Sequence, residues 1–283
     1  MRGRARDVTN LEACNSPWAI TTMGTTLKNP PVYLTLAQVR FNPILKLADF
    51  LPAIQENFRQ AGYPDFSRQQ VILIQLTAQD GQPPMPTPAP QERFQIGNIE
   101  KTHTFILDSQ SLTLQSTNYG QFETFSTCFL KGLEIIHDVV KLAFTERVGL
   151  RYLDRVMPQT GETIEQYLTE QVHGLTSRLG GRSLYSYTEA MNDVDGIKLL
   201  SRVTIQDGPL AFPPDLQPGN MRVTERFLSY KGMSAILDND GFVEGREIFS
   251  AKAVADHLDA IHKVIGIAFK ITAAPYAFVA WDK

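Results

Sequence analysis

Short apolar runs and amphipathic stretches divide the first half of the chain into predicted strands and helices. Val32–Phe41 is rich in β-branched and aromatic residues, a composition typical of a strand. The next stretch has apolar residues at helical spacing and ends at Gly62 and Pro64, so it predicts a helix. Its apolar face comprises Leu47, Phe50, Leu51, Ile54 and Phe58. Further strands are expected at Val71–Leu76, Phe94–Ile99, Thr102–Leu107 and Ser111–Ser116.

A longer helix closes this half, and the second half repeats the order of patterns. The apolar stripe of the first long helix comprises Phe122, Phe125, Phe129, Leu133, Ile136, Val140 and Ala143. Val148–Met157 predicts the next strand, and a helix follows with the face Ile164, Tyr167, Leu168, Val172 and Leu175. Strands are then expected at Leu184–Tyr187, Ile197–Ile205, Arg222–Tyr230 and Met233–Leu237. A second long helix covers residues 255–269.

Three anchors occur in the same order in both halves, which indicates an internal duplication. Residues 130–144 align without gaps on 255–269 and are identical at six of the 15 positions. The two shorter anchors are Arg40–Pro43 with Arg155–Pro158, and Ile106–Asp108 with Ile236–Asp238.

The predicted fold is α+β, with two pseudo-repeats of strand, helix, four strands and helix. In each, a curved antiparallel sheet grips a long helix, as in each half of the TATA-binding protein; the analogy concerns the fold and carries no function. We expect residues 1–28 to form a disordered leader. Residues 29–145 and 146–283 are then the two pseudo-repeats, packed as one compact unit.

Turn-forming residues mark the predicted connections. Gly81–Pro90 and Pro209–Gly219 are proline-rich and predict exposed, semi-rigid loops. Asp108–Ser111 and Asp238–Gly241 follow the two Ile-Leu-Asp anchors and are interpreted as hairpin turns.

Composition narrows the class of protein. The 283 residues are 43% apolar and carry a net charge of −3, which excludes a polybasic protein but leaves room for a local basic face. No apolar run approaches the ~20 residues of a membrane span, and no signal peptide follows the N-terminal arginines. We therefore expect a cytoplasmic protein without a membrane partner. Cys14 and Cys128 are expected to be reduced, with Cys128 inert in the stripe of a helix.

Two segments resemble a family of uncharacterised bacterial proteins that is sporadically distributed. Arg40–Ile44 (Arg-Phe-Asn-Pro-Ile) is similar to the opening of that family. Arg147–Arg155, with Arg-Val-Gly-Leu-Arg-Tyr, is similar to its central signature, although the family usually has asparagine where this chain has Asp154. The resemblance covers the chain from about residue 30 onward and implies no catalytic residues. The scattered distribution implies transfer on mobile DNA, which is typical of accessory genes of defence systems.

Nucleophile elbows and phosphate-binding loops are missing from the sequence, so no catalytic residues and no cofactor are expected. One metal hypothesis arises from the two long helices. Glu134 and His137 share a helical face, and Asp259 and His262 occupy the equivalent positions of the second half. Two carboxylates and two imidazoles could converge on a metal ion if the helices pack side by side. The alternative is that they mark the polar edges of two related helices.

Arginines form the other candidate site. Arg147, Arg151 and Arg155 lie four apart in a predicted strand, so all three project from one face. The predicted neighbouring strands add Arg202, Arg222 and Arg226. Such a basic face could hold a phosphodiester backbone or an acidic protein surface. The alternative is a solvated face of cross-strand charge pairs, with Glu225, Glu189 or Asp193 as the partners.

The leading hypothesis is a non-enzymatic accessory subunit that binds a larger protein, in the context of a horizontally transferred bacterial defence system. The first alternative is a nucleic-acid-binding protein that uses the arginine face, directly or through a ribonucleoprotein. The second is a metal-dependent enzyme that uses the Glu/Asp-x-x-His pairs.

Overall fold

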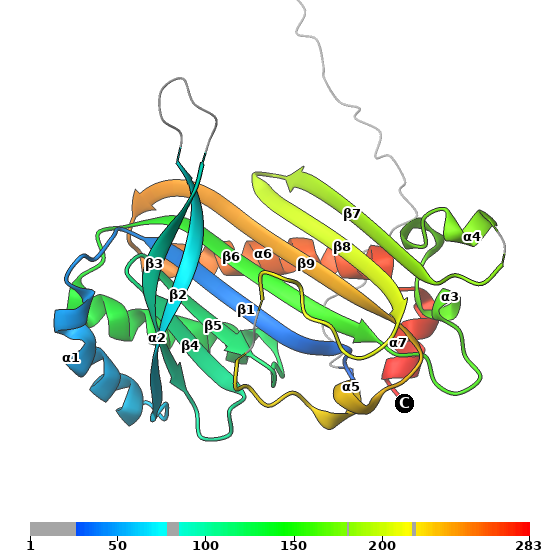
Figure 1. Cartoon of the computed structure of the whole chain (residues 1–283), viewed down its shortest axis with the longest axis horizontal. Helices are drawn as coiled ribbons and strands as arrows, with labels where there is room; N and C mark the ends of the chain where they lie inside the picture. The colour runs from blue at the N-terminus through cyan, green and yellow to red at the C-terminus, as the bar shows by residue number, and fades with distance from the viewer. Residues whose placement is uncertain (1–26, 78–84, 180, 217–218) are drawn as a thin grey trace, which may run out of the picture.

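A computed structural model describes residues 27–77, 85–179, 181–216 and 219–283 (Figure 1). Residues 1–26 of the predicted leader, which include Cys14, lie outside the described residues. The protein is α+β, and its strands form one antiparallel sheet in the order β2-β3-β4-β5-β1-β6-β9-β8-β7. The strands are β1 (Val32–Phe41), β2 (Asp65–Thr77), β3 (Met85–Gly97), β4 (His103–Asp108), β5 (Ser111–Ser116), β6 (Phe144–Val156), β7 (Tyr185–Val194), β8 (Ile197–Asp207) and β9 (Met233–Ile248).

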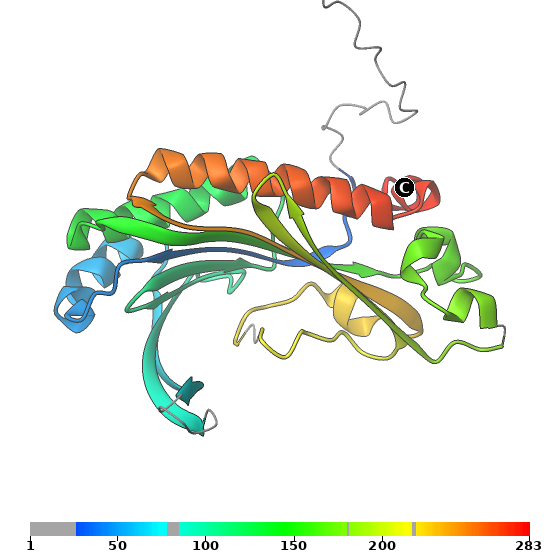
Figure 2. The same cartoon turned by 90° about the horizontal axis from the view of Figure 1, so that it is seen from above.

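Long helices cover one face of this sheet. Figure 2 shows α2 and α6 together on that side, while strands β2 and β3 and residues 208–216 and 219–232 project from the opposite side. We call this opposite side the open face. The helices are α1 (Leu47–Gln60), α2 (Phe122–Val140), α3 (Ile164–Tyr167), α4 (Thr176–Leu179), α5 (Glu225–Ser229), α6 (Ala251–Thr272) and α7 (Pro275–Trp281), with a 3-10 turn at Glu170–Val172.

The hydrophobic core lies between the sheet and α2 and α6. Alternate residues of the strands face it, such as Val39 of β1 and Val148 of β6, and they pack against Leu133, Ile136 and Leu258 of the helices. Burial of these apolar side chains is the main stabilising contribution to the fold. The central pairing of β1 with β6 joins the two predicted halves into a single sheet.

The first half follows the predicted order of strand, helix, four strands and helix. The strand prediction Val32–Phe41 is confirmed at both ends. The second half differs, because residues 222–230 do not form a strand: they contain α5 and coil. Only three strands therefore follow β6 in the described part of this half.

The predicted helix with the face Ile164 to Leu175 is also wrong. It breaks after α3 because Leu168 is extended (φ −118°, ψ 148°) and forms a β-bridge to Ala273. Gly174 then takes a positive φ of 61°, which a helix cannot accommodate. Tertiary contacts thus override the local helical pattern.

Asp108–Ser111 is a hairpin turn, as predicted, but Asp238–Gly241 lies in the middle of β9. Pairing with β6 on one side and β8 on the other keeps this segment extended, and Asp238 and Asn239 are buried. Gly241 is required by packing instead of by a turn. A Cβ atom there would lie 2.6 Å from Cγ2 of Ile261 in α6.

The first proline-rich segment differs from the prediction of an exposed loop, whereas the described part of the second is a loop, which packs on the sheet. Met85–Pro90 belongs to β3 and pairs with β2, and residues 78–84 lie outside the described part. Residues 208–224, which we call the crossing segment, run over the open face; residues 217–218 are not described. The Tyr33 hydroxyl donates to the carbonyl of Ala211 (2.9 Å), and Phe212 packs edge-on against the Tyr33 ring.

Candidate binding groove on the open face

Arg147, Arg151 and Arg155 all project from β6 onto the open face, because the alternate residues Val148, Leu150 and Tyr152 point into the helical core. Strand β9 lies beside β6 and supplies Asp238 and Asp240. The segment Asp238–Gly241, which the sequence predicted to be a turn, therefore supplies carboxylates that face the arginines of β6.

Arg151 is buried and held by two carboxylates. Its Nε and Nη2 donate to the two carboxylate oxygens of Asp238 (2.6 and 2.7 Å), and its Nη1 donates to Asp215 of the crossing segment (2.5 Å). Burial opposes the charge, but the hydrogen bonds to the two carboxylates outweigh it and raise the pKa of Arg151. Such bidentate pairs are rigid, so Arg151 fixes the crossing segment to the sheet.

Arg202 of β8 extends this ionic network. It donates to Asp238 (3.2 Å) and to Glu189 of β7 (2.8 Å). Positive and negative groups therefore alternate from Glu189 through Arg202, Asp238 and Arg151 to Asp215. This part of the face is a set of charge pairs, and its arginines are neutralised.

Arg155 is fully buried and bonds to backbone and hydroxyl groups. It donates to the carbonyls of Phe227 and Gly208 and to Oγ of Ser234 (3.2 Å). Burial lowers the pKa of Arg155. Its contacts hold both ends of residues 208–227 against the sheet, which is a structural role.

Arg222 and Arg226 do not lie in the sheet. The backbone N–H of Arg222 donates to the carbonyl of Lys101 (2.7 Å) at the end of the crossing segment. Arg226 is in α5 and donates to the carbonyl of Pro30. The six predicted arginines are thus divided among separate sites and do not form one basic face.

Arg147 and Arg40 lie directly opposite each other on β6 and β1. The Arg147 guanidinium donates to the Gln38 amide oxygen (3.0 Å) and lies over the Phe242 ring (4.3 Å), but the nearest carboxylate oxygen, of Asp240, is 3.9 Å away. Burial lowers the pKa of Arg147. Arg40 is exposed, and among the described residues no carboxylate lies within 4 Å of its guanidinium.

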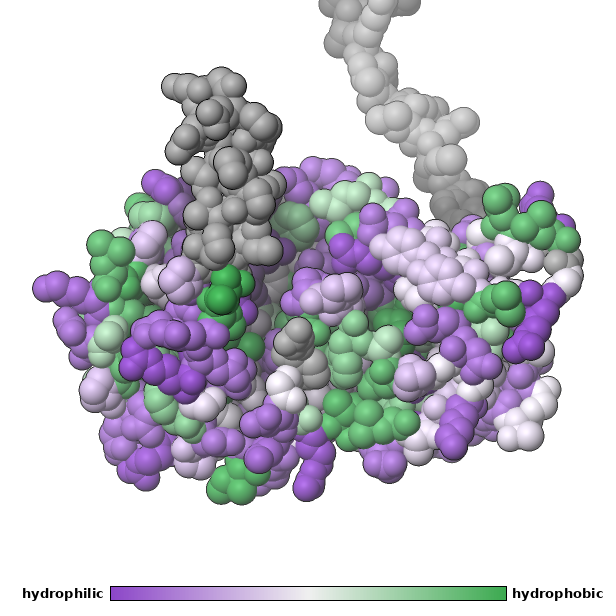
Figure 3. Space-filling view, in the orientation of Figure 1, coloured by the Kyte–Doolittle hydropathy of each residue, from purple (hydrophilic) through white to green (hydrophobic). Residues whose placement is uncertain are grey.

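A hollow of about 320 Å³ opens beside this pair, and we call it the arginine groove. Glycine at position 149 leaves room for the Arg147 guanidinium, since a Cβ atom would lie 2.8 Å from Nη1. Figure 3 views the open face, where hydrophilic residues predominate and apolar side chains gather around α5 and at α4. The lining of the groove includes Leu36, Gln38, Arg40, Thr113, Arg147, Gly149, Arg151, Asp215, Leu216 and Asp240.

The predicted metal ligands do not come together. The two long helices run antiparallel, so His137 stacks on Phe249 just before α6, while His262 stacks on Phe122 at the start of α2. Positions 122 and 137 are about 22 Å apart along α2, at 1.5 Å per residue. Asp259 forms an ion pair with Lys263 (2.5 Å), and Glu134 lies near His137 at the far end. No group of three or more His, Cys, Asp or Glu side chains suited to a metal ion occurs in the described ranges.

His262 has a structural role instead. Its Nδ1 lies 3.0 Å from the Tyr152 hydroxyl, which in turn lies 2.9 Å from that of Tyr119. Burial lowers the pKa of His262, so the neutral ring is favoured in this stacked position.

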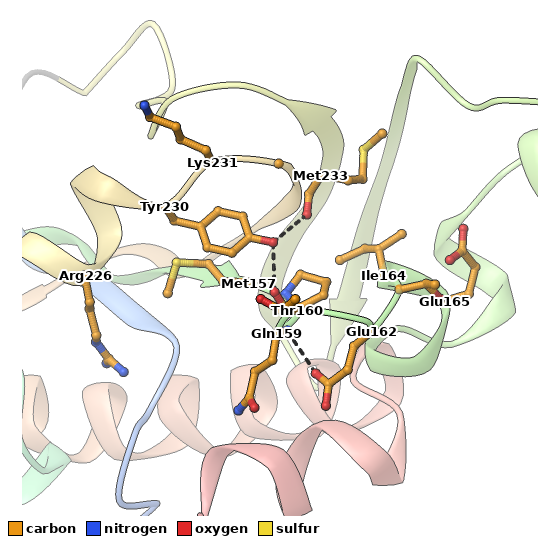
Figure 4. A pocket seen from close by; sticks show the side chains of 13 residues that line it. Met157, Gln159, Thr160, Glu162, Ile164, Glu165, Arg226, Tyr230, Lys231 and Met233 are labelled. Carbon is orange, nitrogen blue, oxygen red and sulfur yellow. Dashed lines mark hydrogen bonds between the residues drawn. The ribbon is translucent and has the colours of Figure 1, made fainter.

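A larger hollow of about 850 Å³ lies between the segment after β6 and the start of β9 (Figure 4). The Tyr230 hydroxyl donates to the carbonyl of Pro158 (2.9 Å) in its wall. Arg226, Lys231 and Glu165 point in different directions rather than toward one another. Without convergent polar groups, this hollow is a weaker candidate than the arginine groove.

No protein-family model and no curated protein matches the chain. Among the described helices, none is long and apolar enough to cross a membrane. The candidate site therefore rests on the geometry of the groove itself.

Sequence reasoning missed Arg40, Asp215 and Asp240 as parts of this site. Arg40 was visible as a strand residue, but its position opposite Arg147 depends on the register of β1 with β6. Asp215 lies in a proline-rich segment, which gave no indication that it crosses the sheet.

Proposed function

We propose that this chain is a non-enzymatic subunit whose arginine groove holds an acidic segment of a larger protein partner. One observation carries the proposal: Arg40 and Arg147 are directly opposite on neighbouring strands in an open hollow. In the described part of the chain, the one carboxylate within 4 Å of either guanidinium is that of Asp240, 3.9 Å from Arg147. Like charges at this position destabilise a sheet. A carboxylate bound between the two guanidiniums would relieve their repulsion and accept charge-assisted hydrogen bonds.

We favour a protein partner over nucleic acid because other arginines of the open face already form ion pairs. Arg151 and Arg202, which a phosphate backbone would need, are already paired with Asp215, Asp238 and Glu189. Binding of a nucleic acid depends on many such contacts and weakens steeply with salt. An acidic protein segment needs only the guanidiniums of Arg40 and Arg147, with further contacts to Leu36 and Leu216 in the groove.

The residues that line the groove support a binding role without catalysis. Its described residues include amide, hydroxyl, carboxylate and guanidinium groups, but no histidine, cysteine or serine that could act as a nucleophile with a base. Thr113 accepts a hydrogen bond from the Gln38 amide (3.0 Å), which fixes both side chains.

Purification from the native host tests this role. Tagged wild type, the double variant Arg40→Glu/Arg147→Glu and the control Lys131→Glu, which changes an exposed cation on the helical side, are compared by mass spectrometry. We expect a stoichiometric protein companion with the wild type and the control but not with the double variant. A companion that all three retain would contradict the proposal, and one lost on nuclease treatment would favour the nucleic-acid alternative. The identity of the companion also tests the predicted place in a defence system.

We also infer that the two halves arose by duplication. The order of the sheet supports this inference, because β1 and β6 are the central pair and each is flanked by the strand that precedes a long helix. Strands β5 and β9 correspond in this way, followed by β4 with β8 and β3 with β7. A pseudo-two-fold axis between β1 and β6 would relate the halves, and superposition of an experimental structure on itself about that axis tests it.

A further inference from the structure

We propose that the outer edge of β7 is a self-complementary surface through which two copies of this chain join their sheets. Strand β7 is the last strand of the sheet, at the upper right of Figure 1. It pairs with β8 over ten consecutive residues without a register shift, so its other edge is long and regular.

The turn that ends β7 determines which backbone groups face outward. Asp195 and Gly196 have φ values of 52° and 82°, the signature of a two-residue type I′ hairpin. In such a hairpin the flanking pair, Val194 with Ile197, is hydrogen-bonded, and hydrogen-bonded pairs then alternate along the ladder. The N–H and C=O groups that point away from β8 belong to Tyr185, Tyr187, Glu189, Met191 and Asp193.

The outward backbone groups of this edge lack most features that block strand addition, although residues 172–173 contact its first half through the hydroxyls of Ser186 and Thr188 (3.1 and 3.2 Å). Strand β7 contains no proline, lysine or arginine and has no bulge, all of which protect natural sheet edges. Tyr185, Tyr187 and Met191 are 56%, 48% and 53% exposed. The carboxylate of Glu189 is paired with Arg202 of the same chain (2.8 Å), but its side chain is still 45% exposed at this edge.

Symmetry and charge narrow the registers that are open to a second copy. A two-fold axis normal to the sheet keeps the open faces of both copies on the same side. Residues opposite each other must then point to the same face, so one residue of β7 lies opposite its own copy at the axis. An axis at Glu189 would place two Glu189 side chains opposite each other, and an axis at Met191 would oppose Glu189 to Asp193. Both registers are disfavoured because like charges directly opposite destabilise a sheet.

An axis at Ala190 would place charged side chains opposite Tyr187 and Met191, whereas an axis at Thr188 gives complementary pairs. Tyr185 then lies opposite Met191 of the second copy, and Tyr187 opposite Glu189. Sulfur–aromatic contacts stabilise the first pair. The outward backbone groups of these residues form about eight hydrogen bonds between the copies, two for each hydrogen-bonded pair. This register covers Tyr185, Tyr187 and Met191 and leaves Asp193 beyond the paired segment.

Sedimentation velocity of the full chain at about 5 and 100 µM tests the proposal first. We expect a species of about 63 kDa, twice the 31.7 kDa of one chain, at the higher concentration. Tyr187→Pro removes an outward N–H and leaves pairing with β8 intact, so it should give a monomer. The control Ile72→Lys introduces a charge at an exposed site on the opposite edge strand and should leave the dimer unchanged. A wild-type monomer at both concentrations, or a dimer that persists in Tyr187→Pro, would overturn the proposal.

Cysteine cross-linking tests the register. Only Thr188 meets its own copy across the proposed axis, in a non-hydrogen-bonded pair whose Cα separation of about 4.5 Å suits a disulfide. Under mild oxidation Thr188→Cys should give a covalent dimer that the wild type, with its own Cys14 and Cys128, does not give. Ala190→Cys should stay uncross-linked. The reverse result would overturn the Thr188 register.

Discussion

Arg40 and Arg147 present like charges to each other, and the nearest compensation for Arg147 is a carboxylate at 3.9 Å, an aromatic ring and an amide. Other arginines on the same face are paired closely with acids: Arg151 and Arg202 both form ion pairs with Asp238. A local conflict of this kind is expected at functional sites, where binding relieves it. Arg40 and Arg147 are therefore interpreted as part of the proposed binding surface.

Neutralising Arg40 should stabilise the free protein. Arg40→Gln removes the repulsion and keeps a polar side chain, so urea denaturation should show a free energy of unfolding that is higher by about 0.2–1 kcal/mol. Lys131→Gln, at an exposed site on α2, is the control and should have no such effect. A loss of stability in Arg40→Gln would mean that an interaction of Arg40 holds the sheet together.

Asp154 makes stability depend on pH. It is buried on β6, and burial together with the nearby charge of Asp238 raises its pKa to about 7. An unfolded aspartate loses its proton near pH 4, so the folded state binds more protons between about pH 4 and 7. The contribution of this residue to the free energy of unfolding therefore falls as the pH rises across that range.

Asp154→Asn should remove this dependence. We expect the Tm of the variant to exceed that of the wild type by more at pH 8 than at pH 5, because only the ionised carboxylate is penalised by burial. Thermal unfolding at the two pH values measures the effect, with the exposed Asp138→Asn as control. Equal shifts at both pH values would contradict the raised pKa.

Arg155 is expected to be essential for stability and not for binding. Arg155→Ala leaves the carbonyls of Phe227 and Gly208 without their donor, and a buried unsatisfied group costs about 1–3 kcal/mol. Chemical denaturation should show at least this loss. An unchanged unfolding midpoint would show that residues 208–227 are held by other contacts.

Among the elements, β9 departs most from the sequence prediction. Asp-Asn-Asp-Gly is a strong turn signal, yet in this chain it lies within a 16-residue strand. Two partner strands and the arginines of β6 and β8 outweigh the local preference. Local propensity predicted the elements of the first half well, because there the turns coincide with the ends of the strands.

The close packing of β9 against α6 gives a matched pair of variants. Gly241→Ala places a methyl group 2.6 Å from Ile261 and 3.2 Å from Ile265, so overpacking should lower the free energy of unfolding by about 1–3 kcal/mol. Gly245→Ala in the same strand meets nothing within 4 Å and should be nearly neutral. Similar stabilities of the two variants would contradict the packing of α6 on this strand.

For the whole molecule, periodicity predicted the α+β class and the long helices, because these depend on residues close in sequence. It did not predict the groove, whose parts come from β1, β5, β6, β9 and the crossing segment. The fourfold spacing of arginines correctly placed Arg147, Arg151 and Arg155 on one face. Ion pairs with Asp215 and Asp238, which are distant from β6 in the sequence, neutralise Arg151, and the spacing could not predict them.

Binding of a simple acidic peptide tests the groove most directly. Fluorescein-labelled deca-glutamate and a ten-nucleotide RNA are titrated with the wild type, Arg40→Glu/Arg147→Glu and Lys131→Glu at 50 and 200 mM salt, and fluorescence anisotropy is recorded. The account predicts that the wild type and Lys131→Glu bind deca-glutamate more tightly than the RNA, and that the double variant loses this binding at least tenfold. Equal binding of the peptide by all three proteins, or preference for the RNA, would contradict it.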